Sequence, residues 1–470
     1  MQSSSLENAT GVNFGPIVLG RTVPFWWIAA GLFLLALLLR LSCFTGLIAS
    51  DDLTYSRFAQ AIADGHYTLE SHFYAIRFGV ILPVGLSYAL FGVNEWSTIA
   101  VPLIASSLAV VVIALCGTRL FGVKAGLIAA LLLATFPVQL YHATILLPES
   151  IAECYAMLAM LAYVWKRDKP TMALGALAGA LVGVAYLTKE PTLFIAPALL
   201  LDAALRRQWR LVAAVAFGLG AVIAAEHVYY LTMSGDLLFR PHAMSLHNNY
   251  VTGGRGQLDD ARFALDYRLF HEYPRMMLLP NIEFGVHSLI ALVLSVIALI
   301  RFRKDQRVYL LVLWAALPWL YLNFGTSSFS HYIPIPVSAR YISIVYPPLF
   351  LLSGWLLADF MSKTVWAPRL ATTVLVAVIA VGVVCGLSAR GKGYRTNHVA
   401  VMRVIADRVV RKGVDSVCFD IEPDTGVKAR WPRAFFILTG GRVPVCEGNS
   451  GRMTIRTDAF GYPYVAAITP

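Results

Sequence analysis

Long apolar runs occupy most of the sequence and constrain its fold more than any other feature. The first extends from Phe25 to Ile48 and contains a single charged residue, Arg40. Runs of about 18 or more apolar residues predict helices that cross a membrane. Only 14% of the residues are charged, whereas a soluble domain has about a quarter. The runs predict eleven membrane spans, at residues 25–48, 98–118, 125–141, 150–165, 171–187, 191–205, 211–233, 284–300, 308–322, 341–360 and 368–389.

The orientation of these spans depends on residues 78–91, an apolar stretch interrupted by Gly79, Pro83 and Gly85. Such a short stretch is typical of a helix that lies on the membrane surface. If it does not cross and the N-terminus is cytoplasmic, the basic clusters all face the cytoplasm, as the positive-inside rule requires. The C-terminus is then extracytoplasmic. We also expect Arg40 to extend its guanidinium toward the membrane surface. The basic clusters are Arg119 with Lys124, 166–169, 206–210, 301–307, and Lys363 with Arg369.

This topology places three large segments outside the membrane, at residues 49–97, 234–283 and 390–470. We therefore expect a membrane domain over residues 1–389 and a small α/β domain over the remaining tail. Cys418 and Cys446 both lie in that tail and could form a disulfide if it is extracytoplasmic.

The first of these segments predicts two surface helices. Tyr55, Phe58, Ala59 and Ile62 recur at i, i+3, i+4 and i+7, which is the apolar stripe of an amphipathic helix. Residues 78–91 would form the second.

Acidic residues mark the outer ends of two spans. Asp51 and Asp52 follow Ser50, and the three could simply cap a helix, because serine and carboxylates stabilise its N-terminus. One carboxylate could instead point into a site as a general base or metal ligand. Asp51 and Glu149 together could hold a divalent cation, or divide base and orienting roles. His331 could also ligate a metal, although its spacing from the other histidines matches no metal motif.

Basic residues gather at the same outer level. Lys189 stands beside Glu190 in a short loop, Arg77 begins the second surface helix, and Arg340 precedes Tyr341 at the start of the tenth span. Such residues can be simple membrane anchors, and a Lys–Glu pair can neutralise itself. Their convergence around acids would also suit a phosphate, which arginine can bind in a bidentate manner.

With these residues the chain resembles the GT-C superfamily of lipid-carrier-dependent glycosyltransferases, in particular the group of bacterial aminoarabinose transferases and protein O-mannosyltransferases. The resemblance covers about residues 20–390 and depends on the order of several motifs and on the matching topology. The motifs are Ser50-Asp51-Asp52-Leu53-Thr54-Tyr55, Leu120-Phe121-Gly122, Leu147-Pro148-Glu149, Leu187-Thr188-Lys189-Glu190-Pro191, and Arg340-Tyr341 with Tyr346-Pro347-Pro348.

The resemblance implies a hexosyl- or pentosyltransferase of the bacterial inner (plasma) membrane. It would move a sugar from a polyprenyl-phosphate donor to an acceptor hydroxyl outside the membrane, and a single displacement would invert the anomeric centre. The chain departs from the family at Glu190, where relatives more often have glycine.

The resemblance also implies roles for individual residues. Asp51 matches the family's first-loop acid and would be the general base or the residue that organises the acceptor, and Asp52 stands where relatives often have glutamate. Glu149 matches the second acidic position. Arg77 would bind the carrier phosphate, and Lys189 matches the family's Thr-Lys motif.

Two other functions fit a polytopic chain. A secondary transporter or lipid flippase commonly shows paired repeats and broken helices near the midplane, whereas here the ionisable residues cluster at the outer ends of spans. A non-catalytic assembly protein could use the tail to bind partners. For an enzyme, the acceptor could be lipid A or lipopolysaccharide, another envelope glycan, or a protein. Nucleic acid is not expected, because no basic stripe with interleaved aromatic residues is present.

Overall fold

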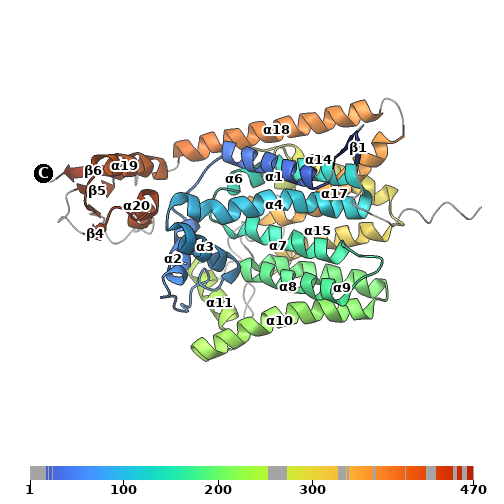
Figure 1. The fold of residues 1–470 in the computed structure, drawn as a ribbon. Helices are drawn as coiled ribbons and strands as arrows, with labels where there is room; N and C mark the ends of the chain where they lie inside the picture. Colours follow the sequence, from blue (N-terminus) through green and yellow to red (C-terminus); the bar gives the residue numbers. More distant parts are fainter. Residues whose placement is uncertain are drawn as a thin grey trace, which may run out of the picture.

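The computed structural model describes residues 17–19, 21–23, 25–251, 273–326, 335, 338–363, 367–396, 398–419, 430–447, 453–457 and 463–468. Long helices form a bundle, and a small α/β domain lies at one end of it (Figure 1). A short antiparallel hairpin, β1 (Ile17–Leu19) and β2 (Arg21–Val23), precedes the first helix.

Each of the eleven predicted spans overlaps one helix or consecutive helical segments, although the first helix ends at Ser42, before the predicted boundary at residue 48. Among the described residues, five helical stretches are long and apolar enough to cross a membrane, and most of the others are shorter apolar helices. The segments are α1 (Phe25–Ser42), α4 (Glu95–Phe121), α5 (Val123–Ala134), α6 (Pro137–His142), α7 (Pro148–Val164), α8 (Met172–Thr188), η1 (Glu190–Phe194), α9 (Ile195–Leu205), α10 (Trp209–Ser234), α14 (His287–Arg301), α15 (Gln306–Phe324), α16 (Ala339–Ile342), η5 (Ser343–Val345), α17 (Tyr346–Met361) and α18 (Ala367–Thr396).

Small residues allow a close helix contact between α8 and α10. A Cβ atom at Gly179 would lie 2.0 Å from the carbonyl oxygen of Val215, and one at Gly218 would lie 1.9 Å from that of Ala176. The two backbones can therefore touch only because both positions are glycine, the usual device of tightly packed membrane helices.

Arg40 does not reach the membrane surface as expected. Its side chain is fully buried, and its guanidinium donates hydrogen bonds to the Ser106 hydroxyl at 2.5 Å and to the Ala36 carbonyl at 3.1 Å. Ser106 in turn donates to Gln139, which contacts Glu153. Polar partners on the neighbouring helices thus replace the water that a snorkelling arginine would seek.

Both segments predicted to lie on the membrane surface are helical, as α2 (Asp51–Ala63) and α3 (Phe78–Phe91). They pack against each other through the predicted apolar stripe, with Tyr55, Phe58 and Ala59 buried. In the long second segment the structure describes α11 (Phe239–Val251) and α13 (Tyr273–Leu278).

In its described residues, the C-terminal domain is a four-stranded sheet with two helices. The strand order is β4-β3-β5-β6; β3 pairs in parallel with β4 and β5, and β5 pairs antiparallel with β6. Cys418 and Cys446 lie opposite each other on β3 and β4 and are joined by a disulfide. Helix α18 continues past the predicted boundary at residue 389. The elements are α19 (His398–Lys412), β3 (Val417–Phe419), α20 (Trp431–Thr439), β4 (Val445–Glu447), β5 (Met453–Thr457) and β6 (Pro463–Ile468).

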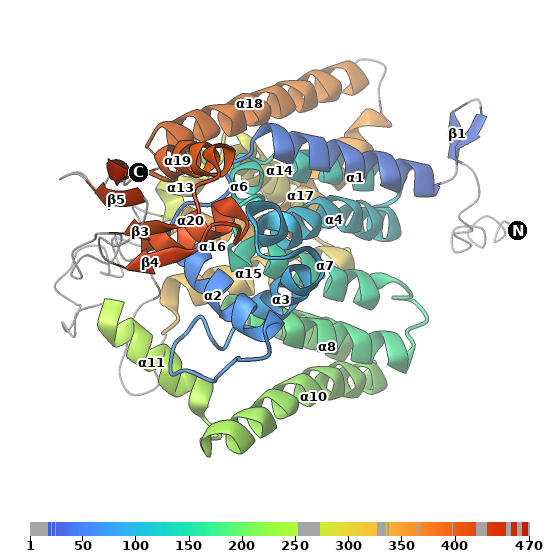
Figure 2. The same cartoon turned by 60° about the vertical axis from the view of Figure 1, so that its left-hand side comes forward.

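This domain docks on the part of the chain between α1 and α4, where it lies over α2 (Figure 2). Its apolar core includes Leu47 and Leu53 from that part. Arg403 of α19 forms an ion pair with Glu95, and Arg433 of α20 donates to the backbone and hydroxyl oxygens of Ser56 at 2.9 and 2.7 Å. The tail therefore helps to hold the helix that begins at Asp51.

Candidate functional site

A cavity of about 470 Å³ opens at the end of the bundle that carries the C-terminal domain. Helix ends and connecting loops supply its walls, so residues far apart in the sequence meet there. Its lining residues are Asp51, Thr54, His72, Phe73, Tyr74, Arg77, Pro148, Glu149, Lys189, Glu190, Pro191, Met244, His247, Tyr321, Ile335, Arg340, Tyr341 and Arg430.

Asp51 presents its carboxylate to this cavity. One oxygen accepts a hydrogen bond from the Tyr74 hydroxyl at 2.7 Å, and the other accepts from Arg340 Nη2 at 3.0 Å. The side chain is 24% exposed, so an incoming hydroxyl could still approach it.

Asp52, the next residue, points the other way. It is fully buried, and its carboxylate accepts from the backbone N–H groups of Ile48 at 2.8 Å and Ser50 at 2.6 Å. Burial raises the pKa of Asp52, and these backbone donors partly oppose the rise. The side chain does not line the cavity, so the geometry argues against the expected catalytic role. The contacts of Asp52 instead stabilise the turn before α2.

Glu149 begins α7 and lies beside two cations. Lys189 Nζ forms an ion pair with one of its oxygens, and Arg340 Nε lies 3.4 Å from the same oxygen. Lys189 Nζ also lies 3.7 Å from the centre of the Tyr341 ring. Arg340 therefore bridges Asp51 and Glu149, the two acids that the sequence singles out.

A second chain of ion pairs begins at Arg77, which is almost fully buried. It donates to the Tyr55 hydroxyl at 2.5 Å and to Glu190 at 2.9 Å. The other oxygen of Glu190 accepts from Arg240 at 3.0 Å, and Arg240 lies 2.6 Å from Glu226. Glu190 thus joins two buried arginines that lie far apart in the sequence, Arg77 and Arg240.

The arrangement does not fit the divalent cation that Asp51 and Glu149 were expected to share. The guanidinium of Arg340 already contacts both carboxylates. Within the described ranges, no three His, Cys, Asp or Glu side chains converge as metal ligands. His331 lies outside the described residues.

Sequence reasoning did not identify several residues of the cavity, among them Tyr74, His72, His247 and Arg430. Burial lowers the pKa of His247 to about 4, with His72 and Arg77 adding to the effect, so its imidazole is neutral near pH 7. Arg430 comes from the tail and donates to the Ala49 carbonyl at 3.4 Å. No local pattern marks these residues, because only tertiary contacts bring them to Asp51.

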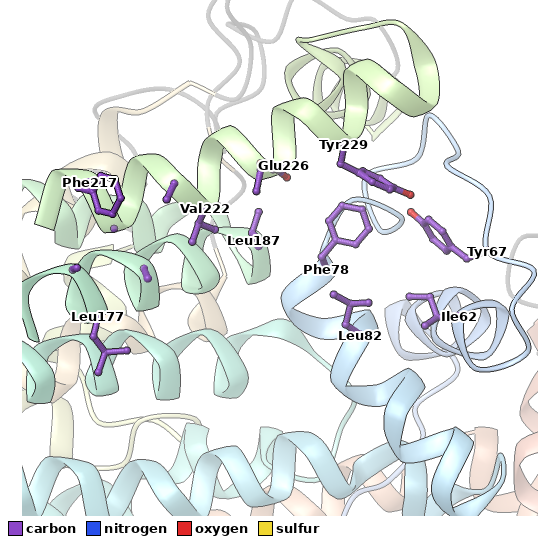
Figure 3. Close-up of a pocket in the computed structure, with 15 residues that line it drawn as sticks. Ile62, Tyr67, Phe78, Leu82, Leu177, Leu187, Phe217, Val222, Glu226 and Tyr229 are labelled. Atoms are coloured by element: carbon purple, nitrogen blue, oxygen red, sulfur yellow. The ribbon is translucent and has the colours of Figure 1, made fainter. Parts of the chain in front are cut away.

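An apolar groove of about 750 Å³ lies beside the cavity, between α3 on one side and α8 and α10 on the other (Figure 3). Phe78, which follows Arg77, packs against Tyr67 and Tyr229 with ring centres 6.2 and 5.3 Å apart. Glu226 lines the groove and is linked through Arg240 to Glu190 of the cavity. The groove is therefore apolar along its length, and Glu226 in its wall is connected to the cavity through two ion pairs of Arg240.

The sequence pattern of the family described as dolichyl-phosphate-mannose-protein mannosyltransferase matches residues 81–244. Among solved structures, ArnT from Cupriavidus metallidurans in the apo state is 14% identical with a TM-score of 0.56, covering 93% of this chain and 94% of that one. The same enzyme bound to undecaprenyl phosphate gives 14% identity and a TM-score of 0.56, covering 93% of each chain.

The oligosaccharyltransferase of Archaeoglobus fulgidus, in complex with Zn and sulfate, is 15% identical with a TM-score of 0.55. The alignment covers 88% of this chain and 62% of that one, so this chain spans less than two thirds of the archaeal enzyme. No curated protein sequence matches. The likenesses confirm the GT-C fold and the predicted resemblance, and with the family match they indicate a membrane glycosyltransferase.

Proposed function

We propose that this membrane glycosyltransferase moves a sugar from a polyprenyl-phosphate donor to a hydroxyl of a cell-envelope acceptor, with Asp51 as the general base. The observation that carries the proposal is the Asp51 carboxylate, which faces a cavity lined by four cationic side chains. A hydroxyl becomes a strong nucleophile as a carboxylate removes its proton. The leaving phosphate gains negative charge during the reaction, so fixed cations stabilise the transition state more than the bound donor.

The charges of the cavity leave room for an anion. Arg77, Lys189 and Arg340 each have a carboxylate partner, whereas the contact of Arg430 is with the neutral carbonyl of Ala49. Four cations thus face three carboxylates. The donor phosphate would supply the missing negative charge.

The apolar groove beside α10 would hold the polyprenyl chain of the donor. Its lining is almost entirely apolar. One lining residue, Glu226, pairs with Arg240 of the Arg240–Glu190–Arg77 chain. The undecaprenyl phosphate bound to the bacterial structural neighbour supports a donor of this chemistry.

The proposed orientation has the N-terminus in the cytoplasm and the cavity with the C-terminal domain on the outer side of the inner membrane. The basic loops support it, because they lie at the opposite end of the bundle from the cavity (Figure 1). The acceptor would be lipid A or lipopolysaccharide, another envelope glycan, or a protein, and a single displacement at the anomeric carbon would invert its configuration.

Purified protein with a polyprenyl-phosphate sugar and an envelope acceptor fraction tests the proposal. We expect a new glycosidic bond, inverted relative to the donor, in the product detected by mass spectrometry and NMR. Movement of the donor across a vesicle membrane without bond formation would instead indicate the flippase alternative.

The rate of transfer should depend on the protonation of Lys189. Burial lowers the pKa of Lys189 to about 8 from the ordinary value of 10.5, with Arg340 and Arg77 adding to the effect and Glu149 opposing it. We expect kcat/KM to fall as the pH rises above about 8, because neutral Lys189 no longer pairs with Glu149. In Lys189→Arg the fall should move to higher pH, since arginine stays protonated.

Thermal stability measured over the same pH range is the control for that profile. Between the folded pKa of about 8 and the unfolded pKa of 10.5, Lys189 binds fewer protons in the folded chain than in the unfolded chain. This group therefore favours folding more as the pH rises. Lysine deprotonation therefore predicts lost activity without lost stability. An identical pH profile in Lys189→Arg would assign the fall to another group.

Arg430 should affect recognition of the acceptor more than the chemical step, because it reaches the cavity from the tail. We expect Arg430→Gln to raise the KM for the acceptor about five- to tenfold with little change in kcat, the pattern of lost uniform binding. Arg442→Gln is the matched control, an exposed arginine of the same domain outside the cavity. An unchanged KM in Arg430→Gln would show that Arg430 does not contribute to acceptor binding.

A further inference from the structure

A second charged pocket, of about 870 Å³, lies at the end of the bundle opposite the candidate site. Three separate parts of the chain meet there: the end of α4, the α7–α8 connection and the α14–α15 connection. Figure 1 shows these ends away from the C-terminal domain. The proposed reaction uses none of these residues.

The pocket carries a large excess of positive charge. Six of its lining residues are cations and two are carboxylates, Asp168 and Asp305. Two of the cations are neutralised by neighbours, since Arg167 pairs with Asp202 at 2.7 Å and Arg307 with Asp305 at 2.5 Å. The lysines of the pocket are Lys166, Lys169 and Lys304, all exposed, and no described carboxylate lies within ion-pair distance of any of them.

Aromatic rings contact two other basic side chains of the pocket, Arg119 and Arg307. The guanidinium of Arg119 lies 4.0 Å from the centre of the Trp165 ring. Arg307 lies 5.2 Å from the rings of Phe121 and Trp355. Cation–π contacts of this kind restrain flexible basic side chains, so the pocket is a built concave surface.

Membrane orientation alone does not explain this arrangement. The positive-inside rule requires basic residues in the cytoplasmic loops, but it does not require them to share a pocket. Lys124, Arg210 and Arg369 lie at the same end of the bundle, are exposed, and do not line the pocket. These three residues satisfy the positive-inside rule equally well, and they match the three pocket lysines in total charge.

We propose that this pocket binds the headgroup of an anionic phospholipid from the cytoplasmic leaflet. The phosphate would lie among Lys166, Lys169 and Lys304. Exposed apolar side chains next to the lining residues, Met172 and Ile300, would contact the acyl chains. A basic pocket between membrane helices on the cytoplasmic side is suited to such a headgroup, and the adjoining apolar surface favours a lipid over a soluble anion.

Native mass spectrometry and thermal unfolding of the full chain test the proposal, with phosphatidylglycerol, phosphatidylcholine and inorganic phosphate as separate probes. Phosphatidylglycerol should bind and raise the unfolding temperature, because a ligand of the folded state stabilises it. The triple variant K166Q/K169Q/K304Q should bind it at least about tenfold more weakly, since each lysine near an anionic headgroup contributes roughly fivefold. The control K124Q/R210Q/R369Q removes the same charge and should bind like the wild type.

Several results would overturn the proposal. Equal losses in the two triple variants would show a nonspecific charge effect, and unchanged binding in K166Q/K169Q/K304Q would place the lipid elsewhere. Equal binding of phosphatidylcholine would exclude recognition of the anionic headgroup. Saturation by inorganic phosphate with the same shift in unfolding temperature would make the ligand a soluble anion.

Discussion

Asp51→Asn should reduce the rate of sugar transfer by about 10²- to 10⁴-fold, the usual contribution of a positioned general base. Asparagine keeps the shape of the side chain and can still accept a hydrogen bond from Tyr74 or Arg340, but it cannot take the proton of the acceptor. The loss should therefore appear in kcat, in a single-turnover assay with saturating donor and acceptor. Binding of the polyprenyl-phosphate donor should remain within a few-fold of the wild type.

Two neighbouring substitutions separate this loss from damage to the helix. Asp64→Asn makes the same change at the exposed C-terminal end of α2 and should leave transfer unchanged. Asp52→Asn should lower thermal stability, by roughly 1–3 kcal/mol for a weakened buried acceptor. A normal rate in Asp51→Asn would assign the base to another residue.

Arg340→Met should lower kcat by about 10²- to 10³-fold, the loss expected when one preorganised electrostatic group is removed. Its guanidinium lies between Asp51 and Glu149, at 3.0 and 3.4 Å. Without it the two carboxylates would face each other with Lys189 as their nearest remaining cation. Asp51 would become a poorly placed base, and the leaving phosphate would lose a stabilising charge.

Arg340→Lys distinguishes charge from geometry. A lysine ammonium is a point charge and cannot span two carboxylates as the planar guanidinium does, so it should restore only part of the rate. Arg57→Met, at an exposed arginine of α2 that pairs with Glu70, should behave like the wild type. If Arg340→Met changed the KM for the donor and left kcat intact, Arg340 would serve binding alone.

The membrane domain could be predicted from the sequence because its signal is local. Apolar runs mark the helices, and the interrupted run at 78–91 forms a separate short helix, α3. The site could also be predicted in part, because Asp51, Glu149, Lys189 and Arg340 all lie at ends of predicted spans on the same side of the membrane. Their contacts with one another agree with that expectation and leave their catalytic roles to experiment.

Features that depend on the detail of a turn or on distant contacts could not be predicted from the residue pattern. Asp51 and Asp52 are adjacent and of the same type, and the local turn in which Ile48 and Ser50 donate to Asp52 decides which one reaches the cavity. The burial of Arg40 depends on Ser106, 66 residues away. Arg430 enters the cavity from a tail whose docking surface is formed by tertiary packing.

The docking of the tail on α2 has a consequence for the biosynthesis of the protein. Asp51 leaves the ribosome long before Arg430, yet both line the same cavity. On the proposed orientation, the segment that carries Arg430 must first be exported, and the Cys418–Cys446 bond then forms in the oxidising compartment. The membrane helices would thus be inserted well before the cavity is complete, so a nascent chain whose apolar groove has already formed would still lack the part of the cavity wall that Arg430 supplies.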